Sequence, residues 1–275
     1  MKKKFTGFLL MFLAAIGLTV STILMKIIPQ TTPLTPAHVA IWRFVIAGLL
    51  FWVLAIFRRS KNKPRKTIPV NFIILGIVFG ISGFSAVFAL DYLPSSIYVI
   101  IIYTYPSLVV LYSLITGKSV PRLFWLGVPL TFIGLFLIAF DFGSALAVDP
   151  AGFLITIVNA LAMTVYFLLS ERFFGKGGSK FHGTCWMLTG SLFFSLLWIP
   201  LLGLRIPDSG TGWAMILSLG ILGTFMPLLS INIGLQLIGA ARGSLIITLQ
   251  PVMTVLFATL FLSETLSLQQ WLGGL

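Results

Sequence analysis

Hydrophobic residues occur in long, nearly uninterrupted runs, which is unlike the pattern of a soluble protein. A helix needs about 20 mostly apolar residues to cross a bilayer. We find nine such runs, at 5–28, 37–57, 69–90, 94–117, 123–140, 151–170, 183–204, 212–237 and 243–262. Because lipid offers the backbone no hydrogen-bond partner, these runs must be helical. The pattern therefore predicts an all-α integral membrane protein.

A tenth apolar run begins at Ser267 and reaches only Leu275. It is too short to span, so we expect the tenth helix to be truncated in this chain.

One run is interrupted by polar groups and a proline, in the sequence Ile-Ile-Ile-Tyr-Thr-Tyr-Pro-Ser-Leu-Val-Val at 100–110. A proline inside a helix leaves the carbonyl four residues before it without its N–H partner. Pro106 would free the carbonyl of Ile102, and Pro251 would free that of Ile247. Lipid does not tolerate such a group, whereas a cavity or a neighbouring helix does. We expect two kinks that face the protein interior near the substrate site; the alternative is a pair of packing kinks without substrate contact.

Charged residues are few, and most of the basic ones lie on one side of the predicted membrane helices. Hydrophobic residues make up 58% of the 275 residues and charged residues 9%, against about 25% in soluble domains. With the N-terminus in the cytoplasm, fifteen of the eighteen basic residues fall on the inner side: Lys2, Lys3, Lys4, Arg58, Arg59, Lys61, Lys63, Arg65, Lys66, Lys118, Arg122, Arg172, Lys176, Lys180 and Arg242. This asymmetry predicts a multi-pass protein of the cell membrane with a cytoplasmic N-terminus. It also explains the net charge of +12 by contact with anionic lipid, so no nucleic-acid partner is expected.

The two halves of the sequence resemble each other at a shift of about 144 residues. His38 and Trp42 have the same spacing as His182 and Trp186, and Ile101–Pro106 aligns with Ile246–Pro251. Five helices per repeat is an odd number, so the second repeat enters the membrane in the opposite orientation. Inverted repeats are typical of secondary transporters, whose substrate site lies between the repeats. We therefore predict a ten-helix inverted repeat (5+5), with units at 1–144 and 145–275.

Short motifs in both halves are similar to those of a known family. The second half carries Gly239-Ala240-Ala241, Ser244, Gln250-Pro251-Val252, Glu264-Thr265-Leu266, Gln270 and Gly273. The first half carries Trp42-Arg43-Phe44, Leu93-Pro94-Ser95-Ser96 and Tyr105-Pro106, with Lys118-Ser119 in place of the glutamate. These motifs resemble the EamA domains of the drug/metabolite transporter superfamily. The resemblance implies ten helices in a 5+5 inverted arrangement that move small metabolites or drugs, mostly outward.

Two basic residues lie inside the predicted helices, Lys26 and Arg43. Intramembrane charges are costly and usually face a cavity or a partner. Lys26 could line a cavity or extend its ammonium to the membrane surface. Arg43 could grip a carboxylate or phosphate with two parallel hydrogen bonds, or form a structural ion pair with Asp91.

Uncharged polar groups at mid-depth complete the predicted substrate site. Tyr98 and Tyr105 are seven residues apart and would share one helical face, from which Tyr103 would point away and serve packing. Asn159 and Gln250 each carry donors and an acceptor that lipid cannot satisfy. The predicted substrate-binding residues are Arg43, Tyr98, Tyr105, Asn159, Thr248 and Gln250.

Other ionisable residues favour transport over catalysis. No acid lies near the middle of a predicted helix, and Glu264 is expected to contact a helix end. His38 and His182 could form a paired pH switch or simply mark the membrane surface. These residues form no catalytic triad and no metal cluster, so we predict no cofactor, no metal and no enzymatic activity.

The predicted function is a secondary transporter that works outward, by alternating access, on a small zwitterionic or anionic metabolite such as an amino acid. The alternatives are an exporter of hydrophobic drugs and a membrane-embedded enzyme. The expected partners are the substrate and the lipid bilayer, for a monomer or a homodimer.

Overall fold

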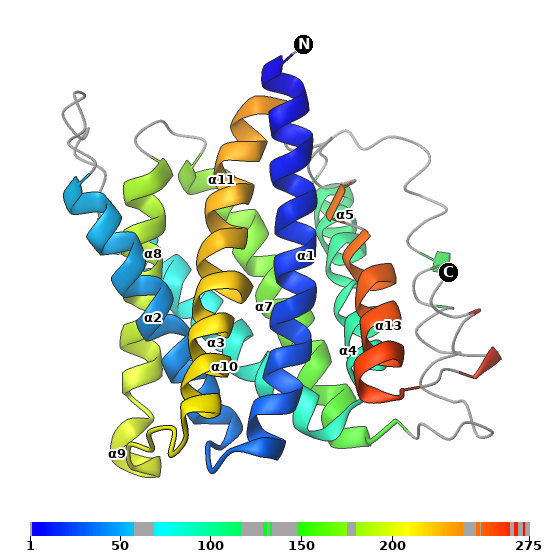
Figure 1. Ribbon diagram of the computed structural model, residues 1–275. Helices are drawn as coiled ribbons and strands as arrows, with labels where there is room; N and C mark the ends of the chain where they lie inside the picture. Colours follow the sequence, from blue (N-terminus) through cyan, green and yellow to red (C-terminus); the bar gives the residue numbers. More distant parts are fainter. Residues whose placement is uncertain are drawn as a thin grey trace.

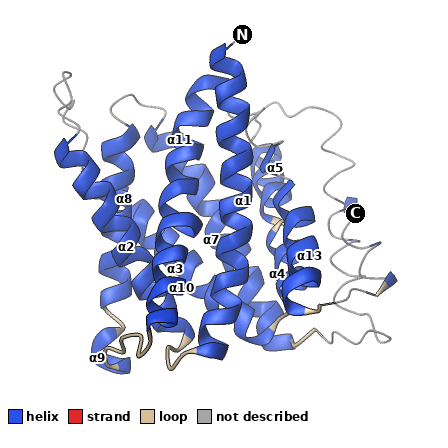
Figure 2. Cartoon of the chain, viewed as in Figure 1, coloured by secondary structure: helices blue, strands red, loops and turns tan. Residues whose placement is uncertain are grey.

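The computed structural model describes residues 2–57, 69–116, 129–130, 133, 148–174, 180–238, 246–247, 249–264, 267–268 and 272, and the statements below concern these residues. Every regular element among them is a helix (Figure 2). The elements are α1 (Lys2–Thr31), α2 (Pro36–Phe57), α3 (Pro69–Tyr92), α4 (Ser95–Ile102), α5 (Tyr105–Ile115), α7 (Pro150–Phe174), α8 (Lys180–Leu196), α9 (Ile199–Leu202), α10 (Gly210–Gly220), η1 (Ile221–Phe225), α11 (Met226–Ile238) and α13 (Leu249–Leu262).

Six helical segments are long and apolar enough to cross a membrane. They are Lys4–Thr31, Pro36–Phe57, Val70–Tyr92, Pro150–Ser170, Phe181–Leu202 and Gly210–Ile231. Two shorter apolar helices, Ser95–Val109 and Leu249–Leu262, accompany them. These segments confirm most of the predicted runs. The predicted fifth helix lies almost wholly outside the described residues, as do Thr248 and most of the tenth run.

Helix α7 shows how an apolar sequence positions polar groups. Leu154, Val158, Leu161 and Val165 recur at helical spacing and are exposed, with Leu154 at 63%. The opposite face holds three polar residues that are nearly inaccessible: Thr156, Asn159 and Thr164. In lipid this distribution stabilises the bundle, because the apolar stripe contacts acyl chains and the polar stripe bonds to other helices.

The helices pack as a bundle of long, roughly antiparallel elements (Figure 1). Helix α1 packs against α11 and α13, while α7 packs against α3, α4 and α5. Helix α3 also packs along α8, where Gly76 lies against the backbone of Met187 and Gly190 against that of Ile73. A side chain at either glycine would collide with main-chain atoms. Gly76 and Gly80 are four residues apart, a spacing that lets two membrane helices approach closely.

At the predicted kink near Pro106, a two-residue turn separates α4 from α5. Helix α4 ends at Ile102, Tyr103 and Thr104 form a turn, and α5 begins at Tyr105. Pro106 is thus the second residue of α5, where a missing N–H costs little. Tyr98 and Tyr105 consequently lie on two successive helices and not on one, and both face α7, where they contact Asn159 and Phe167.

A second irregularity, which the sequence reading missed, lies between α10 and α11. Residues Ile221–Phe225 form a π-helical turn, in which the N–H of Met226 donates to the carbonyl of Ile221 five residues earlier. Pro227 follows, and its ring cannot pack against the carbonyl of Gly223 in a regular α-helix. Widening the preceding turn resolves this conflict, and such turns are frequent at functional sites.

Candidate functional site

Arg43 of α2 is buried in the middle of the bundle, with 7% of its surface exposed. Its Nε donates to the Thr224 hydroxyl at 2.8 Å, and one Nη lies 3.2 Å from the Met25 sulfur. A thioether sulfur is a weak acceptor for a guanidinium group. Within the described residues no carboxylate pairs with Arg43; Asp91, the structural partner considered above, is exposed. The guanidinium carbon also lies 5.5 Å from the centroid of the Phe44 ring. Among the described residues, Arg43 therefore holds a buried positive charge without an anionic partner.

The π-helical turn presents Thr224 to Arg43. The Thr224 hydroxyl donates its own hydrogen to the carbonyl of Leu219, 3.2 Å away and five residues back. Its oxygen is then oriented to accept from the Arg43 Nε. The turn thus satisfies a backbone carbonyl and fixes one side of the guanidinium group, which leaves the far Nη edge of Arg43 open among the described residues.

A second buried polar chain joins α3, α7 and α4. The Ser82 hydroxyl donates to Asn159 Oδ1 at 2.6 Å, and Asn159 Nδ2 donates to the Tyr98 hydroxyl oxygen at 2.8 Å. Asn159 is 1% exposed and Tyr98 6%. The structure therefore brings two of the predicted site residues, Tyr98 and Asn159, into one hydrogen-bonded chain.

Tyr103 joins the turn between α4 and α5 to the region of Pro251 at the start of α13. This contact corrects the packing role predicted for Tyr103. Its hydroxyl lies 3.0 Å from the carbonyl oxygen of Ile247 and 2.9 Å from Gln250 Oε1, and its single hydrogen serves both acceptors. The Ile247 carbonyl is the one that Pro251 deprives of its helical partner. The sequence contained this signal, because a freed carbonyl in a membrane needs a donor from a neighbouring helix.

The remaining predicted residues fall around this centre. Gln250 is the second residue of α13 and accepts from Tyr103, as described above. The Tyr105 ring stacks on Phe167 of α7 at 4.9 Å between ring centroids and lies 5.8 Å from the Tyr103 ring. Thr248 lies outside the described residues. The site is therefore polar on the side of Arg43 and aromatic on the side of α5.

A separate charged cluster lies around the corner between α3 and α4, and it consists of Lys26 and Glu264. The Lys26 ammonium donates to the carbonyls of Leu90 at 2.5 Å and Leu93 at 2.9 Å. Glu264 is 8% exposed and accepts from the Ser95 and Ser96 N–H groups and the Ser96 hydroxyl at 2.8–3.0 Å. The cation caps the C-terminal end of α3 and the anion the N-terminal end of α4.

These contacts decide two predictions. The expectation that Glu264 contacts a helix end is confirmed. Lys26 has a role other than the two considered, because its ammonium completes the backbone hydrogen bonding of the α3–α4 corner.

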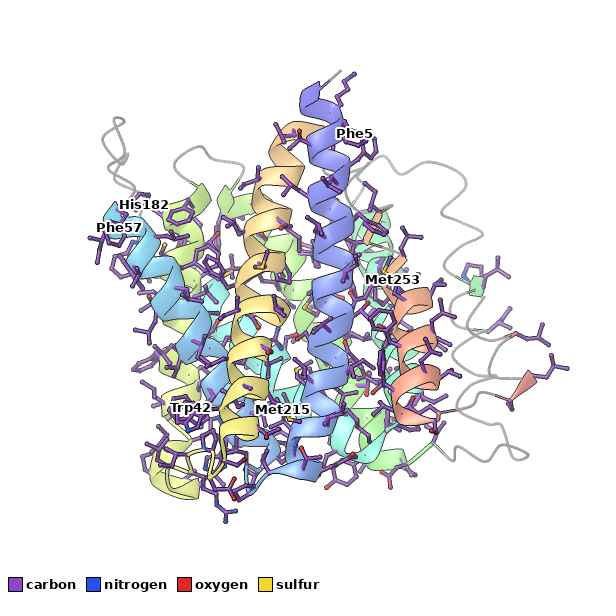
Figure 3. The ribbon with its side chains drawn as sticks, in the orientation of Figure 1. Phe5, Trp42, Phe57, His182, Met215 and Met253 are labelled. Carbon is purple, nitrogen blue, oxygen red and sulfur yellow. The ribbon has the colours of Figure 1, made fainter. Side chains whose placement is uncertain are left out.

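The two histidines are far apart, so a paired pH switch was wrong. His182 lies beside Phe57 at the end of the bundle where α1 begins (Figure 3). His38 lies at the opposite end, where Nε2 bonds to the carbonyl of Gly203 at 3.1 Å and Nδ1 to the Thr35 hydroxyl at 2.6 Å. Since a carbonyl only accepts, Nε2 carries the proton in this arrangement. His38 thereby ties the start of α2 to the segment after α9.

The sequence matches the model of the EamA-like transporter family over residues 5–140 and again over residues 150–275. The chain therefore belongs to the EamA-like transporter family. It is a multi-pass, all-α membrane protein of a transporter family. Its membership implies that it lies in a lipid bilayer and binds a small-molecule substrate.

Curated bacterial proteins are similar over most of this chain. The uncharacterized transporter YdfC of Bacillus subtilis is 24% identical over 250 residues, which cover 87% of this chain and 78% of YdfC. The uncharacterized transporter YyaM of the same species is 28% identical, covering 82% and 76%. The uncharacterized inner membrane transporter YedA of Escherichia coli K12 is 23% identical, covering 86% and 78%.

A solved crystal structure shares the fold. It superposes with a TM-score of 0.62 at 22% sequence identity, covering 98% of this chain and 91% of that one. At this identity the likeness concerns the fold alone.

Proposed function

We propose that the protein is a secondary transporter that exports a small zwitterionic or anionic metabolite, such as an amino acid, across the cell membrane. The observation that carries this proposal is Arg43, a buried cation whose partners among the described residues are a hydroxyl, a thioether and an aromatic ring, all uncharged. Burying an uncompensated charge is costly, so a protein keeps one where a ligand neutralises it. A carboxylate would do so with two parallel hydrogen bonds.

Alternating access between two inverted five-helix units is the mechanism we propose, with the units at 1–144 and 145–275. The two separate matches to the family model support this division. The packing supports it too, because α1 contacts α11 and α13 while α7 contacts the matching helices α3 and α4. The excess of basic residues in alternate loops supports a cytoplasmic N-terminus.

The polar contacts of the site cross between the proposed units. Arg43 bonds to Thr224, Ser82 to Asn159, and Tyr103 to Gln250. In each pair the first residue belongs to the first unit and the second residue to the second. If one unit rocks against the other, these hydrogen bonds break and others form. Substrate binding at this site would therefore be coupled to the relative position of the two units.

Reconstituted vesicles test the proposal. The wild-type protein should exchange labelled amino acids or organic anions across the membrane, and Arg43→Gln should lower the rate about 100-fold, because a charged hydrogen-bond donor pair is lost. Arg172→Gln, at an exposed arginine in the last turn of α7, is the matched control and should transport normally. Equal rates for Arg43→Gln and the wild type, at equal folded yield, would remove Arg43 from the site.

The aromatic side of the site favours a second candidate, export of hydrophobic drugs. Tyr105 stacks on Phe167, and Phe79 contacts both Phe44 and Tyr166. Such rings bind apolar and cationic compounds without a carboxylate. Transport of this kind would not require Arg43, so drug efflux that persists in Arg43→Gln distinguishes it from the first candidate.

A further inference from the structure

The hydrogen-bond acceptors of the candidate site are uncharged among the described residues. Asn159 Oδ1 accepts from Ser82, and the Tyr98 oxygen accepts from Asn159. The Ile247 carbonyl and Gln250 Oε1 share the single hydrogen of the Tyr103 hydroxyl. A substrate ammonium could donate to the remaining lone pairs of these oxygens, but neutral acceptors do not compensate a second positive charge beside Arg43.

The donors, by contrast, are available. Arg43 has five N–H groups, and the described residues engage one at Nε and one at Nη1. The Tyr98 hydroxyl accepts from Asn159, while its own hydrogen has no acceptor among the described residues. The remaining N–H groups of Arg43 suit the two oxygens of a carboxylate, which accept two parallel hydrogen bonds from a guanidinium group.

The net charge of the buried site also disfavours a substrate that carries an ammonium group. The acids with described side chains are Asp91, Asp149, Asp208 and Glu264; Asp91 and Asp208 are exposed, Asp149 caps α7 and Glu264 caps α4. In the sequence, Asp141 and Glu171 also lie at the ends of apolar runs. A carboxylate would neutralise Arg43 and leave the buried site neutral. A zwitterion would add an ammonium for which the described site offers no anion.

We propose that this site accepts a monocarboxylate that lacks an ammonium group, and that it discriminates against the corresponding zwitterionic amino acid. The proposal rests on the proposed transport function and narrows its substrate class. The aromatic side of the site, formed by Tyr105 and Phe167, would cover the uncharged remainder of the substrate.

Pairs of 2-hydroxy acids and amino acids with the same side chain test this proposal, because they differ by a hydroxyl in place of an ammonium. The full chain is reconstituted in vesicles, and initial uptake is measured for the members with the side chains of alanine, leucine, methionine and phenylalanine. We expect the hydroxy acids to enter at least about tenfold faster than the amino acids, since an unpaired buried charge costs this much or more. Thermal shift of the purified protein in detergent provides a second measurement, in which the hydroxy acids should stabilise and the amino acids should not.

Arginine variants and amines serve as controls for these measurements. Arg43→Gln should remove both the uptake and the thermal shift, and Arg43→Lys should restore part of each because it returns the charge without the planar fork. Amines with the same side chains and no carboxylate should be neither bound nor moved.

The outcomes separate this proposal from the transport function itself. Uptake of amino acids that equals or exceeds that of the hydroxy acids, and that depends on Arg43, overturns the monocarboxylate preference and keeps the transport function. If neither series is moved or bound by the wild type, both proposals are wrong. Faster uptake of hydroxy acids that persists in Arg43→Gln also overturns the inference, because the selectivity would then arise elsewhere.

Discussion

Two regions of this bundle each bury basic charge, and they differ in how completely that charge is satisfied. At the α3–α4 corner, Lys26 binds two backbone carbonyls and Glu264 accepts three hydrogen bonds. Arg43 of α2, by contrast, contacts one hydroxyl, one sulfur and the Phe44 ring, and among the described residues it has no anionic partner. Both cations lie in apolar runs of neighbouring helices, so sequence position does not separate them. The difference teaches that the partners of a buried charge decide whether it stabilises the fold or remains open to a ligand.

The largest effect that would test this comparison is expected at Lys26. Lys26→Met should lower the free energy of unfolding by about 3 kcal/mol, because two carbonyls at the end of α3 lose a charged donor and Glu264 loses a nearby cation. Denaturation in mixed micelles, followed by tryptophan fluorescence, measures this change. Lys4→Met is the matched control, since Lys4 is exposed at the other end of α1 and should change stability little. Equal effects at both positions would contradict a structural role for Lys26.

A smaller loss is expected for the anion of the same corner. Glu264→Gln should lower the free energy of unfolding by about 2 kcal/mol, because the amide retains one acceptor and turns its NH₂ group toward the donors of Ser95 or Ser96. The same denaturation measurement applies, with Asp208→Asn as the control at an exposed acid. If Glu264→Gln preserves stability but abolishes transport, the corner belongs to the transport mechanism and the division between the two regions is wrong.

The opposite sign is expected at Arg43. Arg43→Met should raise the free energy of unfolding of the unliganded protein by about 1–2 kcal/mol, since it removes a buried charge that the described residues leave mostly unpaired. It should also remove any stabilisation by substrate. A fall in stability as large as that of Lys26→Met would show that Arg43 is a structural residue, and the contrast between the two regions would disappear.

The smallest effect is expected at Tyr103, whose hydroxyl donates to the Ile247 carbonyl. Tyr103→Phe removes the donor to the Ile247 carbonyl and should cost about 1 kcal/mol of stability while changing the transport rate, because the bond joins the two proposed units. Tyr92→Phe is the control, since Tyr92 is exposed at the end of α3. Identical transport by both variants would limit Tyr103 to a packing role.

Much of the fold could be predicted from the sequence because hydrophobic length alone specifies a membrane helix. The six long segments and the end contact of Glu264 were predicted and confirmed. For the candidate site, the importance of Arg43, Tyr98 and Asn159 could be predicted, because a buried polar group in an apolar run requires a partner. Their partners could not, since side chains 61 to 181 positions apart form these bonds.

The sequence by itself determined which segments lie in the membrane, that the helix around Pro106 is interrupted, and how few charges are buried. The tertiary structure alone decided that Lys26 caps a helix, that Tyr103 bonds to the carbonyl freed by Pro251, and that a π-helical turn presents Thr224 to Arg43. The physical reason is that apolarity acts locally along the chain, whereas a hydrogen bond depends on which helices become neighbours. In a protein with so few charges, that choice of neighbours determines which charge remains available for a substrate.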